Sequence, residues 1–244
     1  MAKRSRKRVV DERWEAKAVK GKTVKQKFGE ERSIQLRPLT ERQAEYMRMI
    51  EDQDLILCTG LAGTSKSHVA TAMACQWYRE GLIESIVVSR PAISNSKSLG
   101  FYGGNLVEKM TNWLEGVLPV MYQYLGRNVV ELAIKRGDIK FVPLEVIKGF
   151  SANDCFFIVD EAEDITFEEA KKIVTRQGRN CTMVLSGDVS QSELKERSGL
   201  KMLIDMARKY EIDIGIMDFN RVDDIVRSDQ CKQWIMAFTM EESK

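Results

Sequence analysis

Short apolar runs alternate along the chain with longer segments in which apolar residues recur at helical spacing. The apolar runs have the length of buried strands, and the segments between them have the length of helices. The expected strands are Leu55–Thr59, Ile86–Ser89, Ile139–Val142, Cys155–Val159, Thr182–Leu185 and Ile212–Met217. The expected helices are Glu41–Asp52 with Thr40 as N-cap, Lys66–Arg79, Asn105–Leu125, Phe167–Thr175 and Leu200–Lys209. This alternation predicts an α/β fold in which helices cover both faces of a mostly parallel sheet.

The first 35 residues lack this periodicity and are rich in lysine. Residues 1–32 hold 12 Lys and Arg against 5 Asp and Glu, whereas the rest of the chain holds 26 against 31. We therefore expect a basic, mobile arm over residues 1–35 and one compact domain over residues 36–240. The run Lys3–Arg8 is of the kind that attracts nucleic-acid phosphates by counterion release, although a solvated terminus without a partner has the same composition.

Composition excludes several classes of protein. Apolar residues make up 43% of the 244 residues, which is enough for a large core. No apolar run approaches the roughly 20 residues that span a bilayer, so we expect a cytoplasmic protein without a membrane partner. The five cysteines lack metal-ligand spacing and are expected to be reduced, and His68 is the only histidine. A zinc site and a Cys-His nucleophile are therefore not expected.

The expected strand Leu55–Thr59 runs into a glycine-containing loop and then into an expected helix. The loop and helix start read Gly60, Leu61, Ala62, Gly63, Thr64, Ser65, Lys66, Ser67 and His68. A loop at a helix N-terminus surrounds an anion with backbone N–H groups, as in the phosphate-binding loop (P-loop) of nucleotide-binding proteins. Lys66 is expected to reach the terminal phosphates of ATP, and Ser67 to bind Mg²⁺. Ser65 replaces the usual glycine, and we expect an ordinary backbone φ to suffice at this helix start.

A second acidic motif follows the strand Cys155–Val159. Asp160 and Glu161 stand at the end of this buried run, where the crevice of an open parallel sheet binds ligands. In this Walker B-like position Asp160 is expected to hold Mg²⁺, and Glu161 to orient and polarise the attacking water. An acidic N-cap is the structural alternative, but Asp164 or Thr166 can serve the helix that follows.

A third strand end carries polar residues, in the run from Met183 to Gln191. In P-loop ATPases with an additional strand, such a strand lies between the P-loop strand and the Walker B strand. Gln191 is then expected to touch the γ-phosphate or the water, while Asp188 caps the turn or supports Gln191. An ordinary Gly-Asp turn is the alternative.

Several motifs, taken in order, resemble the PhoH-like family of P-loop ATPases, which are related to the core of superfamily 1 helicases. They are Gly60–Ser67, Arg90–Ala92, Leu99–Phe101, Asp160–Ala162, Gly187–Gln191, Ser198–Leu200 and Asp224–Arg227. The resemblance covers roughly residues 36–239 and implies a RecA-like P-loop NTPase fold. It also implies that Gln43 reads adenine and that Arg227 acts as an arginine finger, in cis or across a subunit interface. Gln43 can equally be a surface residue and Arg227 a surface ion pair, and Arg221 and Arg197 compete for the finger role.

The resemblance further implies ATP with Mg²⁺, a homohexameric ring, and RNA or single-stranded DNA bound by the arm and the ring pore. The form without a second domain is similar to versions seen in bacteriophages. Some relatives carry a nuclease domain before the ATPase, and residues 1–35 are too short for one, so we expect no nuclease activity. Helicase-like activity would need assembly, because a second RecA-like domain is not expected.

Two other functions stay open on the sequence. A nucleotide-dependent scaffold with slow turnover is compatible with Ser65 in the loop. A small-molecule kinase shares the first motif, but the Asp160-Glu161 pair and the polar strand end before Gln191 suit an ATPase better.

Overall fold

A computed structural model describes residues 34–91, 116–144, 147 and 151–242 of the chain. The predicted arm therefore lies almost wholly outside the described residues. So do Ala92 of the Arg90 motif, the motif Leu99–Phe101, and residues 105–115 of a predicted helix.

Six strands in the described residues form one parallel sheet, in the order β3-β2-β4-β5-β1-β6. The strands are β1 (Leu55–Gly60), β2 (Ser85–Ser89), β3 (Ile139–Phe141), β4 (Cys155–Val159), β5 (Cys181–Ser186) and β6 (Gly215–Phe219). The predicted α/β class is confirmed. Strand β5, whose end carries the third group of polar residues, lies between β1, which leads into the P-loop, and β4, which leads into the acidic pair, as predicted.

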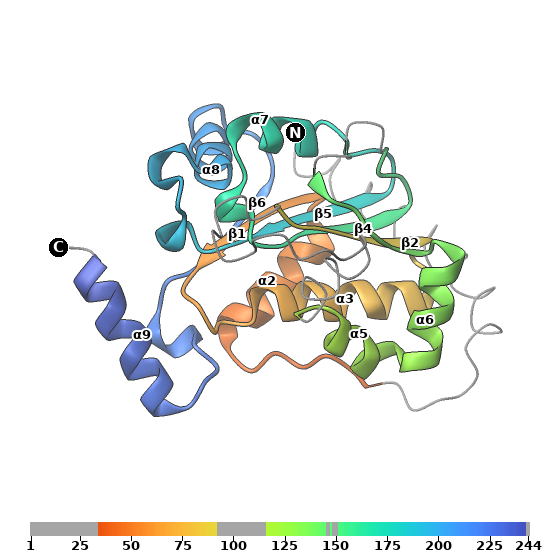
Figure 1. Ribbon diagram of the computed structural model, residues 1–244, viewed down its shortest axis with the longest axis horizontal. Helices are drawn as coiled ribbons and strands as arrows, with labels where there is room; N and C mark the ends of the chain where they lie inside the picture. The colour runs from red at the N-terminus through yellow and green to blue at the C-terminus, as the bar shows by residue number, and fades with distance from the viewer. Residues whose placement is uncertain (1–33, 92–115, 145–146, 148–150, 243–244) are drawn as a thin grey trace, which may run out of the picture.

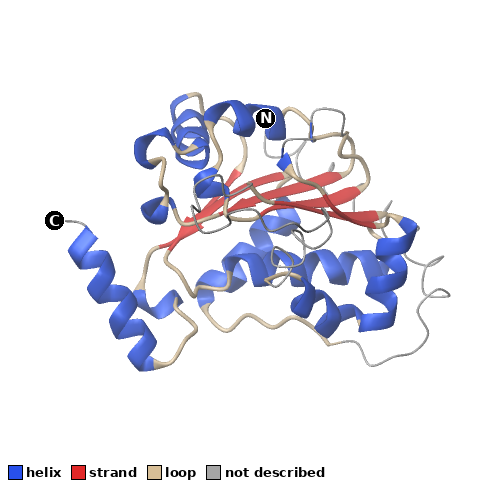
Figure 2. Cartoon of the chain, viewed as in Figure 1, coloured by secondary structure: helices blue, strands red, loops and turns tan. Residues whose placement is uncertain are grey.

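Helices cover both faces of this sheet (Figures 1 and 2). One layer holds α2 (Glu41–Asp52), α3 (Lys66–Glu80), α5 (Leu118–Leu125) and α6 (Arg127–Arg136), and the other holds α7 (Phe167–Val174) and α8 (Gly199–Lys209). The last helix, α9 (Asp229–Glu242), extends away from both layers. None of the described helices combines the length and apolar character needed to cross a membrane.

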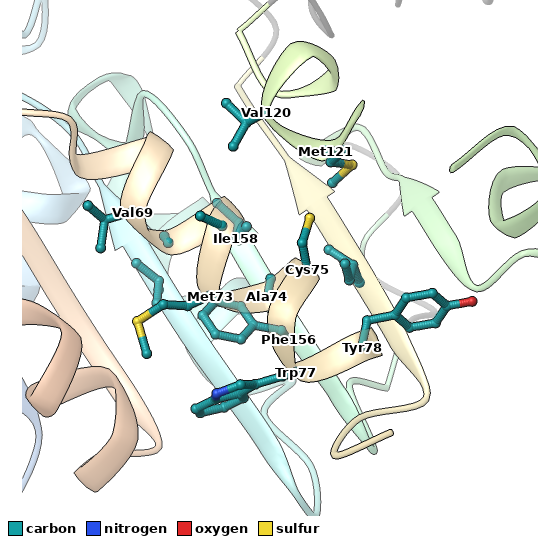
Figure 3. Packing of buried hydrophobic residues seen from close by; sticks show 14 of the residues in the cluster. Val69, Met73, Ala74, Cys75, Trp77, Tyr78, Val120, Met121, Phe156 and Ile158 are labelled. Atoms are coloured by element: carbon teal, nitrogen blue, oxygen red, sulfur yellow. The ribbon is translucent and has the colours of Figure 1, made fainter. Parts of the chain in front are cut away.

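Alternate residues of each strand face the two layers, because side chains alternate along a strand. In β4, Phe156 and Ile158 pack in one buried cluster with α3, while Phe157 and Val159 pack in a second with α7 and α8. Figure 3 shows side chains of α3 between the sheet and Met121 of α5. Burial on both faces explains why the strands read as continuous apolar runs rather than as an alternating pattern.

Two predicted elements differ from the structure. The strand expected at Ile212–Met217 begins only at Gly215, where pairing with β1 starts, and Ile212 is half exposed. The predicted helix ending at Leu125 includes a turn at residues 116–117, after which α5 begins at Leu118 with a proline in its first turn. Proline is favoured in the first turn because the N–H groups of that turn have no partner within the helix, so a residue without an N–H loses no hydrogen bond. Two helices, α6 and α9, were not predicted.

Candidate functional site

The carboxyl ends of β1, β4 and β5 bring the three sequence motifs to one edge of the sheet. β1 ends in Gly60 and the loop leads directly into α3, which begins at Lys66. The Thr64 hydroxyl donates to the carbonyl of Leu61 at 2.9 Å, which closes the loop on itself. The N–H groups of the first turn of α3 and the positive end of its dipole therefore face the loop, as an anion site requires.

Ser65 adopts a left-handed backbone, with φ 66° and ψ 28°. The prediction that an ordinary φ suffices at this position is therefore wrong. The loop must reverse direction between Gly63 and Lys66, and Ser65 takes the conformation that glycine adopts without a steric penalty. An L-residue in this conformation costs about 1 kcal/mol or more.

Lys66 points back into the loop rather than into solvent. Its Nζ donates to the carbonyl oxygens of Gly60 at 2.6 Å and Leu61 at 2.9 Å, and the residue is 9% exposed. An ammonium held by these loop carbonyls lies beside the N–H groups of α3. Its predicted contact with the terminal phosphates of ATP stays a prediction.

Three side-chain oxygens meet between α3, β4 and β5. Ser67 Oγ donates to Asp160 Oδ1, and Ser186 Oγ lies 3.4 Å from that carboxylate oxygen and 3.5 Å from Ser67 Oγ. Hydroxyl and carboxylate oxygens are the donors that Mg²⁺ prefers. These oxygens therefore fit a Mg²⁺ ion, for which Ser67 and Asp160 are the predicted ligands. Ser186 was missed, although it directly follows a predicted strand.

Glu161 follows Asp160 in a left-handed conformation, with φ 51°. Its carboxylate forms an ion pair with Arg90, which directly follows β2. Neither Asp160 nor Glu161 caps α7, because Thr166 caps that helix in a reciprocal pair with Glu169. The position of the real N-cap thus excludes the structural alternative for the acidic pair.

Glu163 is a buried carboxyl at the same edge and was not singled out from the sequence. It is 9% exposed, and its Oε2 has no hydrogen-bond partner among the described residues. Burial raises the pKa of Glu163 to about 7, against the opposing effect of backbone hydrogen bonds. A Cβ on Gly187 would meet Oε2 and would also stand 2.7 Å from the backbone nitrogen of Glu163, so glycine is required for this close approach. Spacing alone carries no signal for this contact.

In the turn after β5, Asp188 has a structural role, whereas Gln191 faces a small pocket. Asp188 accepts from the N–H of Ser190 at 3.1 Å and from its hydroxyl at 2.6 Å, so it caps the 3-10 turn Val189–Gln191. Gln191 is exposed and, with Leu61 of the loop and Phe238 of α9, lines a small pocket. Its predicted contact with phosphate stays a prediction.

Gln43 and His68 each have a partner within the chain. Gln43 is 2% exposed; its Oε1 accepts from the N–H of Leu39 at 2.8 Å, and its Nε2 donates to the carbonyl of Thr64 at 3.4 Å. It thereby joins the start of α2 to the P-loop, and its adenine-reading role stays a prediction. The His68 ring packs edge-on against Tyr124, and burial lowers its pKa.

Arg227 lies against the loop of its own chain. The N–H of Val226 donates to the carbonyl of Gly63 at 3.0 Å, and a Cβ on Gly63 would stand 2.9 Å from Arg227 Cγ. Gly63 has φ 76°, a conformation that favours glycine, and a Cβ here would also force the Arg227 side chain to shift. Arg221 and Arg197 are exposed residues on other turns.

Comparison with known proteins gives matches over most of the chain. A family model described as PhoH-like protein matches residues 35–239. The PhoH-like protein of Bacillus subtilis (strain 168) is 32% identical over 205 residues, which cover 83% of this chain and 64% of that protein. Protein PhoH of Escherichia coli (strain K12) is 30% identical over 203 residues, covering 82% and 57%. The chain thus matches about 57–64% of the length of these two relatives.

Two solved structures share the fold. The large terminase of a thermophilic bacteriophage has a TM-score of 0.52 at 12% identity, covering 81% of this chain and 50% of that one. The HK97 bacteriophage large terminase has a TM-score of 0.51 at 13% identity, covering 91% and 53%. At these identities the likeness concerns the fold alone.

Proposed function

Because the chain belongs to the PhoH-like protein family, we propose that it is an ATPase that uses the loop Gly60–Ser67 and the acidic pair Asp160-Glu161. The observation that carries the proposal is the meeting of Lys66, Ser67 and Asp160 at one sheet edge, although more than 90 residues separate the last two. A chance motif match would not bring the acidic strand end onto the first turn of α3.

The reaction assigned to this site is attack of water on the γ-phosphorus of ATP. The bond to the β,γ-bridging oxygen breaks, ADP and phosphate leave, and Glu161 accepts the proton of the water. Lys66 exchanges its two carbonyl partners for phosphate oxygens. Ser67 and Asp160 would hold Mg²⁺, which neutralises phosphate charge when bound. Gln191 is assigned to the γ-phosphate side, since it lines the pocket beside the loop.

Arg227 is assigned a role in cis. Its side chain packs on Gly63 of the same chain, so it needs no neighbouring subunit to reach the loop. A cation placed there stabilises the charge that develops on the phosphates in the transition state.

Two substitutions test the proposed activity by steady-state phosphate release. Lys66→Ala is expected to lose ATP binding and turnover, and Glu161→Gln to keep binding but lose turnover by about 10²-fold or more. The exposed Lys209→Ala is the charge-matched control. Equal turnover in wild type and Lys66→Ala would refute the ATPase.

We also propose that hydrolysis serves a task on RNA or single-stranded DNA, in a homo-oligomer of the chain. The charge excess of residues 1–32 supports the nucleic-acid part, since phosphate contacts give salt-dependent binding without sequence choice. The test is ATPase activity with single-stranded and duplex RNA and DNA, at two salt concentrations, for the full chain and for one lacking residues 1–32. Stimulation that is absent for every nucleic acid, or independent of the arm, would refute it.

A further inference from the structure

Arg90 stands where the second and fourth strands bring it beside the acidic motif. β2 pairs with β4 in parallel, with Ser89 opposite Val159, and the N–H of Asp160 donates to the carbonyl of Ser89 at 2.9 Å. Backbone hydrogen bonds therefore fix the positions at which Arg90 and Asp160 leave the two strands. This register places Arg90 next to Glu161, and the guanidinium Nη2 pairs with Glu161 Oε1.

The ion pair is partly removed from solvent. The side chains of Arg90 and Glu161 are 19% and 35% exposed, and Arg90 Nε is buried without a hydrogen-bond partner among the described residues. Charge-assisted hydrogen bonds of this kind are about twice as strong as neutral ones and are screened less than exposed pairs. The pair therefore competes effectively with water for the carboxylate of Glu161.

Two further carboxyl groups lie within the electrostatic reach of Arg90. The charges of Asp160 and Glu163 both raise the pKa of Arg90, opposing the larger lowering by burial. Glu163 Oε2, like Arg90 Nε, lacks a hydrogen-bond partner in the described structure. The carboxylate of Asp160 therefore remains as an opposite charge near Arg90 when the guanidinium leaves Glu161.

We propose that Arg90 is a positioning residue that restrains Glu161, so that turnover requires the guanidinium to release this carboxylate toward the attacking water. The inference rests on the proposed ATPase activity. While the pair is closed, Oε1 of Glu161 is held by a cation, which favours the charged carboxylate and so weakens its tendency to accept a proton from the water. Arg90 thereby sets the basal rate without contacting the reacting atoms.

The test is the kcat and KM for ATP of Arg90→Ala and Arg90→Lys. Removing the restraint is expected to raise basal kcat about tenfold in Arg90→Ala, the equivalent of 1.4 kcal/mol, with KM unchanged. Arg90→Lys keeps the charge but not the planar fork, so its kcat should lie between those of wild type and Arg90→Ala. The exposed Arg208→Ala is the control for loss of an arginine.

A merely structural role for Arg90 would lower kcat or stability and could not raise kcat. In Arg90→Ala/Glu161→Gln the gain must vanish, because the rate increase acts through Glu161. An unchanged or lower kcat in both single variants overturns the restraint, and if Arg90→Ala fails to fold, Arg90→Lys decides alone. A wild type no faster than Lys66→Ala overturns the proposed ATPase itself and the restraint with it.

Discussion

At the scale of single residues, Ser65 is the position where the loop departs most from its pattern. It adopts φ 66°, and Ser65→Gly relieves a steric cost of about 1 kcal/mol or more while adding flexibility to the unfolded chain. We expect a net gain of about 0.5 kcal/mol in the free energy of unfolding, measured by urea titration. Ser65→Ala, which keeps the Cβ, should give no gain. A Ser65→Gly variant less stable than wild type would contradict the left-handed conformation.

Glu163 gives the protein a pH-dependent stability. Its pKa of about 7 lies above the usual 4.5, so the native chain keeps a proton that the unfolded chain releases between these values. The contribution of Glu163 to stability therefore falls as pH rises through this window and stays low above it. Glu163→Gln removes this loss, and its stability relative to wild type should rise by on the order of 2 kcal/mol between pH 4.5 and 7.

Urea titrations of both proteins across that range measure the difference, with the exposed Glu168→Gln controlling for loss of a carboxylate. A wild-type minus Glu163→Gln difference that stays constant from pH 4.5 to 7 would show that this carboxyl is not buried in the folded chain.

At the scale of elements, the sheet could be predicted because its strands are buried on both faces. The runs at Cys155–Val159 and Leu55–Thr59 are recognisable by apolar content alone, and the helix Glu41–Asp52 by the cap at Thr40. The start of β6 could not be found this way, because pairing with β1 rather than hydrophobicity decides it. Contacts between distant segments, such as Gly63 with Arg227 and Gly187 with Glu163, leave no trace in local pattern.

The segment between β6 and α9 carries the element-scale prediction. Because Val226 and Arg227 contact Gly63 of the same chain, Arg227→Ala should lower kcat by about 10²-fold or more, and no neighbouring copy should compensate. Mixing Arg227→Ala with Lys66→Ala separates the two finger arrangements. If Arg227 acts in cis, the mixture stays inactive. Recovered phosphate release would instead place the arginine across a subunit interface.

At the scale of the whole molecule, the chain divides into a body with a helix layer on each face of the sheet and a helix that extends from it. In α9 the side chains of Trp234, Phe238 and Met240 are 59%, 61% and 64% exposed. The same helix contributes Ile235 and Phe238 to the pocket beside Leu61 of the loop. The helix thus carries largely exposed apolar side chains, one of which, Phe238, also lines the pocket beside the loop.

From this placement we expect the intrinsic fluorescence of Trp234 to report on ATP binding. The Trp234 ring stacks on that of Phe238, with centroids 5.8 Å apart and planes at 27°, and Phe238 in turn lines the pocket beside the loop. Filling the loop with ATP should therefore change the fluorescence of the Trp234 indole, in intensity or wavelength, without any added label. Trp234→Phe should remove the change and Lys66→Ala should prevent it, so emission titrations read binding separately from hydrolysis.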